Sequence, residues 1–362
     1  MQVASTLLID RRRFLRAAGA GFVASLSPQS LRAASSTDVI FASAYKAPNG
    51  SFGVATLTEQ GEVLHRYTLP DRGHDIVSNP EGDQLVAFAR RPGTFAAIID
   101  PSHQTPPRLI SSANGRHFYG HGVFSADGKF LFATENDFEN ARGTIGVYDA
   151  TNGFQRVGEY DAYGTGPHDI DLLPDNKTVV IANGGIETHP DYPRAKLNIA
   201  TVAPNLSFID VETGQLKAQF KLPADGHKLS IRHLTVLGEQ VCFACQNEGN
   251  VTDARSLVGS VSLVNGDFGL LELPMTINAS LRGYVGSIAS NPRTNQIAIT
   301  SPVGGVGYKI DVATNKIEQM TSLDGVCGVA ELRKNFVTST GAGVFNKVET
   351  AEVWDNHLAN IG

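Results

Sequence analysis

Histidine recurs at one register of an internal repeat, and this repeat constrains the fold more than any other feature of the chain. Three clear units are RGHDIVSNPEGDQLVAFAR from Arg72, YGHGVFSADGKFLFATEND from Tyr119 and GPHDIDLLPDNKTVVIANG from Gly166. Each contains a histidine, an apolar strand, a turn rich in Pro, Asp, Asn and Gly, and a second apolar strand. His74, His121 and His168 lie 47 residues apart, twice over. A period of this length with several short strands per unit is typical of a β-propeller.

The pattern continues to the end of the chain. The register position is held by His233 in IRHLTVLGEQVCFACQNE, Gly286 in YVGSIASNPRTNQIAIT, Cys327 in GVCGVAELRKNFVTST and His357 in DNHLANIG. Seven units of about 47 residues fill the chain from about residue 35. We therefore predict an all-β, seven-bladed β-propeller with four strands, A to D, in each blade.

The two ends of the repeat predict how the ring closes. Residues 38–69 have the pattern of strands B, C and D with no strand A before them. The C-terminal NHLANIG has the pattern of a strand A with nothing after it. We expect these segments to share one blade, because such closure removes the free sheet edges between the first and last blades.

Charge and hydropathy exclude two classes of partner. The net charge is −6 and no basic block occurs after the N-terminal segment, which argues against nucleic-acid binding. No apolar run reaches 18 residues, so we expect no membrane span in the mature chain. Residues 35–362 are predicted to form a single, monomeric domain.

The N-terminal segment has the features of an export signal. Arg11-Arg12-Arg13-Phe14-Leu15-Arg16 matches the twin-arginine pattern, with Asp10 in place of the usual Ser or Thr. A weakly hydrophobic stretch rich in Ala and Gly follows, and small residues near Ala33 and Ala34 allow cleavage. We predict a signal peptide over residues 1–34 and a periplasmic mature protein.

The repeat register predicts a metal site. Strand A of each blade lines the central channel of a propeller, so residues in one register should converge around one channel mouth. The predicted metal ligands are His74, His121, His168, His233 and His357, with Cys327 from the same register and Glu135 from the end of a strand B. Imidazoles with a thiolate suit iron, copper or zinc. We expect three or four histidines to bind iron or copper, with Glu135, Cys327 or an anion completing the set.

Charged residues beside the register suggest two further roles. Asp75 and Asp169 each follow a ring histidine and could accept a hydrogen bond that orients an imidazole, although neighbours on a strand point to opposite faces. The arginines predicted to bind an anionic substrate or cofactor at the mouth are Arg72, Arg90, Arg116, Arg232 and Arg282. The alternative is that these arginines lie on the surface and pair with nearby carboxylates.

The chain resembles an exported bacterial propeller family known as a domain of unknown function, number 1513. The resemblance rests on the twin-arginine leader, the H-G-V-F-S-x-D-G-K unit from His121 and the W-D-N-H segment from Trp354, and covers nearly all of the mature chain. That family accompanies imelysin-like and di-haem peroxidase-like proteins, which implies these as periplasmic partners in iron acquisition. The histidine ring is also similar to the copper-cluster propeller of nitrous oxide reductase. Gly286 and Cys327 depart from that pattern, which argues against a full seven-histidine copper cluster.

Three functions remain open from the sequence. The first is a periplasmic propeller that binds a transition metal or metal complex at the channel mouth, in iron or copper acquisition. The second is a lactonase- or oxidoreductase-like enzyme that uses a metal-bound water at the same site. The third is a scaffold that docks a protein and whose histidines are structural. No G-x-S-x-G, P-loop or C-x-x-C-H motif occurs to favour other chemistry.

Overall fold

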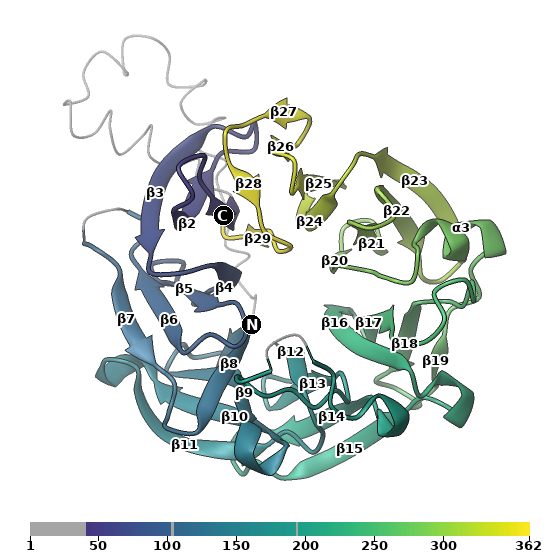
Figure 1. Ribbon diagram of the computed structural model, residues 1–362, viewed down its shortest axis with the longest axis horizontal. Coiled ribbons are helices and arrows are strands. Elements are labelled where there is room, and N and C mark those ends of the chain that lie inside the picture. Colours follow the sequence, from purple (N-terminus) through teal and green to yellow (C-terminus); the bar gives the residue numbers. More distant parts are fainter. Residues whose placement is uncertain (1–40, 103–104, 193–194) are drawn as a thin grey trace, which may run out of the picture.

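The seven predicted blades are present in the computed structural model, which describes residues 41–102, 105–192 and 195–362. The described chain forms seven antiparallel sheets in a ring, with the innermost strands around a central channel (Figure 1). This confirms the seven-bladed β-propeller. The twin-arginine segment and the boundary expected at residues 34 and 35 lie outside the described residues.

Blades two to seven each consist of four consecutive strands, with the innermost strand first. Blade two contains β4 (Gly73–Ser78), β5 (Leu85–Ala89), β6 (Phe95–Ile99) and β7 (Arg108–Ser111). Blade three contains β8 (Arg116–Phe124), β9 (Phe130–Asp137), β10 (Arg142–Asp149) and β11 (Gln155–Asp161). Blade four contains β12 (Pro167–Leu172), β13 (Thr178–Asn183), β14 (Asn205–Asp210) and β15 (Leu216–Lys221).

The remaining consecutive blades follow the same order. Blade five contains β16 (Leu229–Leu237), β17 (Gln240–Asn247), β18 (Val258–Ser262) and β19 (Phe268–Leu270). Blade six contains β20 (Ser287–Asn291), β21 (Gln296–Ser301), β22 (Val306–Asp311) and β23 (Lys316–Ser322). Blade seven contains β24 (Val326–Leu332), β25 (Asn335–Thr340), β26 (Val344–Phe345) and β27 (Val348–Glu349). A short helix, α3 (Met275–Ser280), connects blades five and six; none of the helices in the described ranges is long and apolar enough to cross a membrane.

Blade one joins the two ends of the chain, as predicted. It contains β1 (Phe41–Lys46), β2 (Phe52–Leu57), β3 (Val63–Leu69), β28 (Val353–Trp354) and β29 (Ala359–Asn360). Trp354 of β28 pairs with Tyr45 of β1, and Ala359 of β29 pairs with Ala42. The break between β28 and β29 contains His357, whose backbone carbonyl accepts a 2.7 Å hydrogen bond from Ser43 Oγ. The innermost strand of the closing blade is therefore interrupted at the register histidine.

Apolar side chains fill the spaces between adjacent blades. Phe88 of blade two and Phe118 of blade three are fully buried, with ring centroids 5.6 Å apart. Cys242 and Cys245 of blade five are free and fully buried. Burial of this apolar surface holds neighbouring sheets together.

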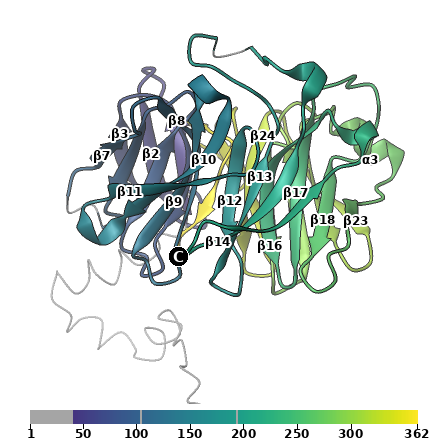
Figure 2. The ribbon, with the colours of Figure 1, turned by 90° about the horizontal axis from the view of Figure 1, so that it is seen from below.

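The insertion between β13 and β14, residues 184–204, distinguishes the two faces of the ring. The insertion follows the second strand of blade four, so it lies on the face where innermost strands begin (Figure 2). We call this the insertion face and the other the opposite face. Thr188 anchors the insertion, because its hydroxyl lies 3.1 Å from Tyr119 Oη and its carbonyl accepts a hydrogen bond from Asn136.

Candidate metal centre

The five register histidines converge in the channel. The ring centroids are 4.5 Å apart for His74 and His357, 4.7 Å for His121 and His357, and 4.8 Å for His168 and His233. Each of the five is at most 9% exposed. We call this group of five the histidine cluster.

Irregular pairing in the innermost strands turns these side chains inward. In blade two, Gly73 pairs with Ala89 and Ile76 with Ala87, so His74 and Asp75 together oppose a single residue. The pairing also shifts at the histidines of β8, β12 and β16. A β-bulge breaks the strict alternation of side chains and re-aims them, which is why a histidine and the aspartate after it can both face the channel.

Two carboxylates from flanking blades hold His121. Its Nδ1 lies 3.2 Å from Asp75 Oδ2 and 3.2 Å from Asp169 Oδ1. Asp75 follows His74 and Asp169 follows His168, so each aspartate contacts the histidine of the neighbouring blade. Burial would lower the pKa of His121, but the charges of Asp169 and Asp75 outweigh it and raise that pKa to about 10. The centre of the cluster thus favours positive charge.

A third carboxylate orients His74. Asp355 is buried and its Oδ1 lies 3.2 Å from His74 Nδ1. Its carboxylate also pairs with Arg72 Nε and, at 3.3 Å, with Arg90 Nη1. Burial opposes ionisation, but the bond to His74 and the two arginines hold the pKa of Asp355 well below its usual value. With Nδ1 bonded to this carboxylate, His74 has Nε2 available as a ligand.

The other four histidines favour the neutral form. Burial lowers the pKa of His74, His168 and His233 well below the ordinary value, and burial with the charge of His121 lowers that of His357 to about 4. Neutral imidazole is the form that binds metals. The nitrogens buried without a hydrogen-bond partner among the described residues include His121 Nε2, His168 Nδ1, His233 Nδ1 and His357 Nε2.

The ligand atoms fall into two overlapping triplets. His74, His121 and His168 form one, and His121, His233 and His357 form the other. Within each triplet the ligand atoms lie within 4.8 Å of one another. His121 belongs to both triplets. An ion bound through its Nε2 would replace the proton that Asp75 and Asp169 favour on this ring, and it could draw its other ligands from either side.

An acidic cavity of about 470 Å³ opens from the cluster toward the opposite face. It is lined by His121 and His357 and by four carboxylates: Asp75, Asp169, Asp171 and Glu331. These charges attract cations along this half of the channel. Burial and the charge of Asp169 raise the pKa of Asp171 to about 7.

Asp171 should make stability depend on pH. Because its pKa in the folded protein exceeds the unfolded value of about 3.9, stability is greatest below that value and falls as pH rises through about 7. The Asp171→Asn variant should therefore be more stable than the wild type at pH 8, by about 1–2 kcal/mol, and not at pH 3.5. Urea unfolding at both pH values measures this difference, with exposed Asp253→Asn as the control. An equal effect at both pH values would contradict the assignment.

Cys327 occupies the register but does not join the cluster. Its Sγ lies 3.2 Å from the carbonyl of Asp355 and 3.6 Å from that of Ser339, and donates to these oxygens. Burial raises the pKa of the thiol to about 11, which disfavours the thiolate that binds metals. The metal-ligating triplets found in the described part of the chain do not include it. The expectation of Cys327 as a ligand is therefore corrected.

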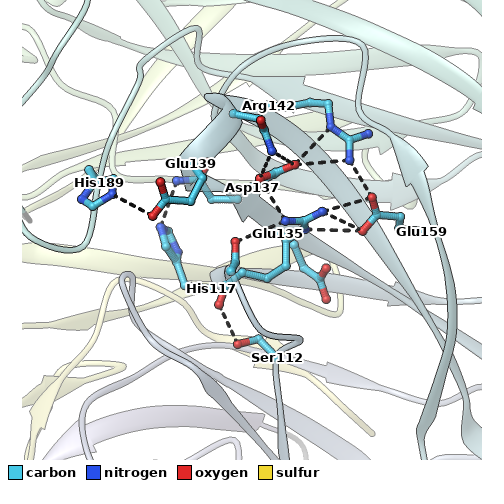
Figure 3. A network of polar contacts seen from close by, with 12 residues as sticks. Ser112, His117, Glu135, Asp137, Glu139, Arg142, Glu159 and His189 are labelled. Carbon is cyan, nitrogen blue, oxygen red and sulfur yellow. Dashed lines mark hydrogen bonds and ion pairs between the residues drawn. The ribbon is translucent and has the colours of Figure 1, made fainter.

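Glu135 is also directed elsewhere. Its oxygens accept hydrogen bonds from Tyr148 Oη at 2.5 Å on β10 and from Arg156 Nη2 at 2.8 Å on β11, so the side chain points outward through the blade. Figure 3 shows it within a polar network of blade three that contains Asp137, Arg142 and Glu159. The prediction that Glu135 is a metal ligand is therefore wrong, and Glu135 instead forms an ion pair with Arg156 inside the blade.

The five arginines fall into four environments. Arg72 and Arg90 lie beside the cluster through Asp355. Arg232 is buried and pairs with Glu248 at 3.0 Å. Arg116 belongs to the polar network of blade three, because it pairs with Asp137 at 2.9 Å and with Glu159 at 3.3 Å. Arg282 is exposed, and among the described residues it bonds only the carbonyl of Val303, at 3.3 Å. Arg116 and Arg282 were predicted to lie at the channel mouth, and the structure places both elsewhere.

Comparison with known proteins supports the fold and identifies the family. No curated protein matches the chain. Hydrazine synthase of Kuenenia stuttgartiensis has a similar structure, with a TM-score of 0.60 and 14% sequence identity over 81% of this chain and 90% of that chain. At this identity the likeness concerns the fold alone. The family described as "Protein of unknown function (DUF1513)" matches residues 67–361, and the chain belongs to that family.

Proposed function

We propose that the protein binds a transition-metal ion at the histidine cluster. The observation that carries this proposal is the set of four imidazole nitrogens that are buried without a hydrogen-bond partner among the described residues, within the group of five histidines. Buried polar atoms ordinarily have a partner, and a metal ion supplies one to several nitrogens at once. Asp75, Asp169 and Asp355 add the outer carboxylates that orient metal-binding histidines.

The donor set favours metals that accept imidazole. Nitrogen ligands without a thiolate suit iron, copper or zinc. Three or four of the five histidines would provide an ordinary coordination shell, with metal–nitrogen distances of about 2.0–2.1 Å for zinc. We propose iron or copper as the ion, in line with acquisition of one of these metals in the periplasm. The twin-arginine leader supports the periplasmic setting, and imelysin-like or peroxidase-like periplasmic proteins are the proposed partners.

Metal analysis of protein purified from the periplasm tests the binding proposal. We expect about one equivalent of iron or copper per chain by elemental analysis. Protein stripped by chelator and dialysed should take up the same metal in calorimetry. A protein that holds neither iron, copper nor zinc, as isolated or after addition of each metal, would falsify the proposal.

Export by the twin-arginine pathway has a separate test. Replacing Arg11 and Arg12 by Lys should leave the precursor in the cytoplasm, because the receptor recognises the guanidinium pair. Cell fractionation and immunoblotting measure the distribution. Arg13 is replaced in a second variant, since it can substitute in a shifted register. Normal periplasmic accumulation of the triple variant would contradict the assignment.

A further inference from the structure

A second cavity, on the insertion face, has charged lining residues that are mostly cations. It has a volume of about 830 Å³ and lies between the loops at Arg72 and Arg91 and the insertion at Thr188 and Lys196. Its lining contains four cations (Arg72, Arg90, Arg91 and Lys196) and one carboxylate, Asp71. The chain as a whole carries a net charge of −6, so this concentration of positive charge runs against its overall composition.

Arg91 is the distinctive residue of this cavity. Its guanidinium makes no hydrogen bond or ion pair with any other residue that the structure describes, whereas Arg72 and Arg90 share Asp355 and Lys196 pairs with Glu248. Burial and the nearby charges of Arg232 and Arg90 outweigh the opposing effects of Tyr119 and Glu248 and lower the pKa of Arg91 to about 10. The protein thus holds a partly buried cation among like charges, which costs free energy unless an anion joins it.

A buried arginine near Arg91 also favours an anion at this site. Arg232 is 6% exposed, and only one side of its guanidinium is paired, with Glu248. Its Nε is buried without a partner among the described residues. Glu187 of the insertion lies near Tyr119 but does not line the cavity.

We infer that this cavity binds a small organic oxyanion, carrying carboxylate or phosphate groups, through Arg91 with Arg90 and Arg72. Guanidinium groups bind such anions through paired, charge-assisted hydrogen bonds. A volume of about 830 Å³ is typical of a site for a small organic molecule and exceeds what an inorganic ion needs. Arg72 and Arg90 connect this cavity to His74 through Asp355, but binding of an anion by the guanidinium groups requires no metal ion.

Calorimetry on metal-free, chelator-free protein at low ionic strength tests the inference. The probes are citrate, glycerol 3-phosphate and inorganic phosphate, with glycerol as the neutral control. We expect an organic oxyanion to bind more tightly than inorganic phosphate, glycerol not to bind, and added salt to weaken binding. Citrate binding without glycerol 3-phosphate binding identifies a carboxylate ligand, and the reverse identifies a phosphate ligand.

Two variants locate the site. Arg91→Gln should weaken binding at least about tenfold, because one charge-assisted contact is lost. This variant removes no bond seen within the described protein, so it should fold normally. Arg282→Gln is the matched control, since Arg282 is exposed and outside the cavity lining. The inference is overturned if no probe binds, if inorganic phosphate binds as well as both organic anions, or if Arg91→Gln binds like the wild type.

Discussion

Replacing Trp354 by Ala is expected to lower the free energy of unfolding by about 3–5 kcal/mol, the usual cost of removing a large aromatic side chain from a core. Trp354 is 2% exposed and lies on the C-terminal strand β28 that closes the ring. Its ring centroid is 6.2 Å from that of Tyr45 and 6.1 Å from that of Phe345, so it joins blade one to blade seven. Its Nε1 also donates a 2.9 Å hydrogen bond to Thr350 Oγ1.

Chemical unfolding followed by far-ultraviolet circular dichroism measures this loss, since Trp354 is the only tryptophan and its removal abolishes the fluorescence signal. The neighbouring Val353 is 45% exposed, and Val353→Ala should change the free energy of unfolding by less than about 0.5 kcal/mol. If the two variants are equally stable, the closing blade does not depend on this contact.

The blades could be predicted from the sequence because local turn chemistry repeats with the strands. Asp127-Gly128 lies between β8 and β9, as its turn pattern indicates. Asp149, predicted to end a strand C, accepts hydrogen bonds from the backbone N–H groups of Thr151 and Asn152 in the next turn. Each signal is contained in a few consecutive residues, so no knowledge of the tertiary structure is needed to read it.

The histidine cluster could be predicted from the repeat register. The contacts between its histidines and the surrounding carboxylates could not. Regular alternation would place His74 and Asp75 on opposite faces, and a bulge overrides that rule. Asp355 lies in the W-D-N-H segment noted in the sequence, two residues before His357, yet its partner His74 is 281 residues away. Only ring closure brings Asp355 and His74 together, so the local sequence around either residue does not predict their contact.

Two predicted metal ligands are wrong because the direction of a side chain, and not its position in the repeat, decides what it contacts. Glu135 is near the end of β9, but its side chain crosses to Tyr148 and Arg156 instead of the channel. Cys327 is in register, but the backbone at Ser339 and Asp355 offers its thiol carbonyl acceptors. The sequence analysis named Arg90 and not Arg91 as an anion-binding residue, because Arg90 holds the strand-end position of the repeat. Arg91 differs from its neighbours in having no hydrogen-bond or ion-pair partner among the described residues, and this can be seen only in the structure.

Replacing His168 and His357 together by Ala is expected to abolish metal retention. The change removes one ligand from each triplet and leaves two in each, while His121 keeps its bonds to Asp75 and Asp169. Loss of only a hydrogen-bond partner of a ligand costs about 10- to 100-fold in metal affinity, so loss of two ligands should cost more than about 100-fold. Elemental analysis and calorimetry measure the effect. Replacing His121 and His168 together should have the same result, although it also removes the His121 partner of Asp75 and Asp169.

The matched control replaces His189 and His227, which lie outside the channel, so that the number of histidines lost is equal. His227 is partly exposed, and its Nδ1 bonds the carbonyl of Ala224. His189 lies in the insertion near Glu139. This control should retain metal like the wild type. Tryptophan fluorescence, which reports on Trp354 in the closing blade, establishes that each variant is folded, because the apolar contacts between blades are unchanged. A folded His168→Ala/His357→Ala protein that binds metal as tightly as the control would place the ion away from the histidine cluster. Equal loss in both proteins would show that binding follows total histidine content instead of the channel geometry.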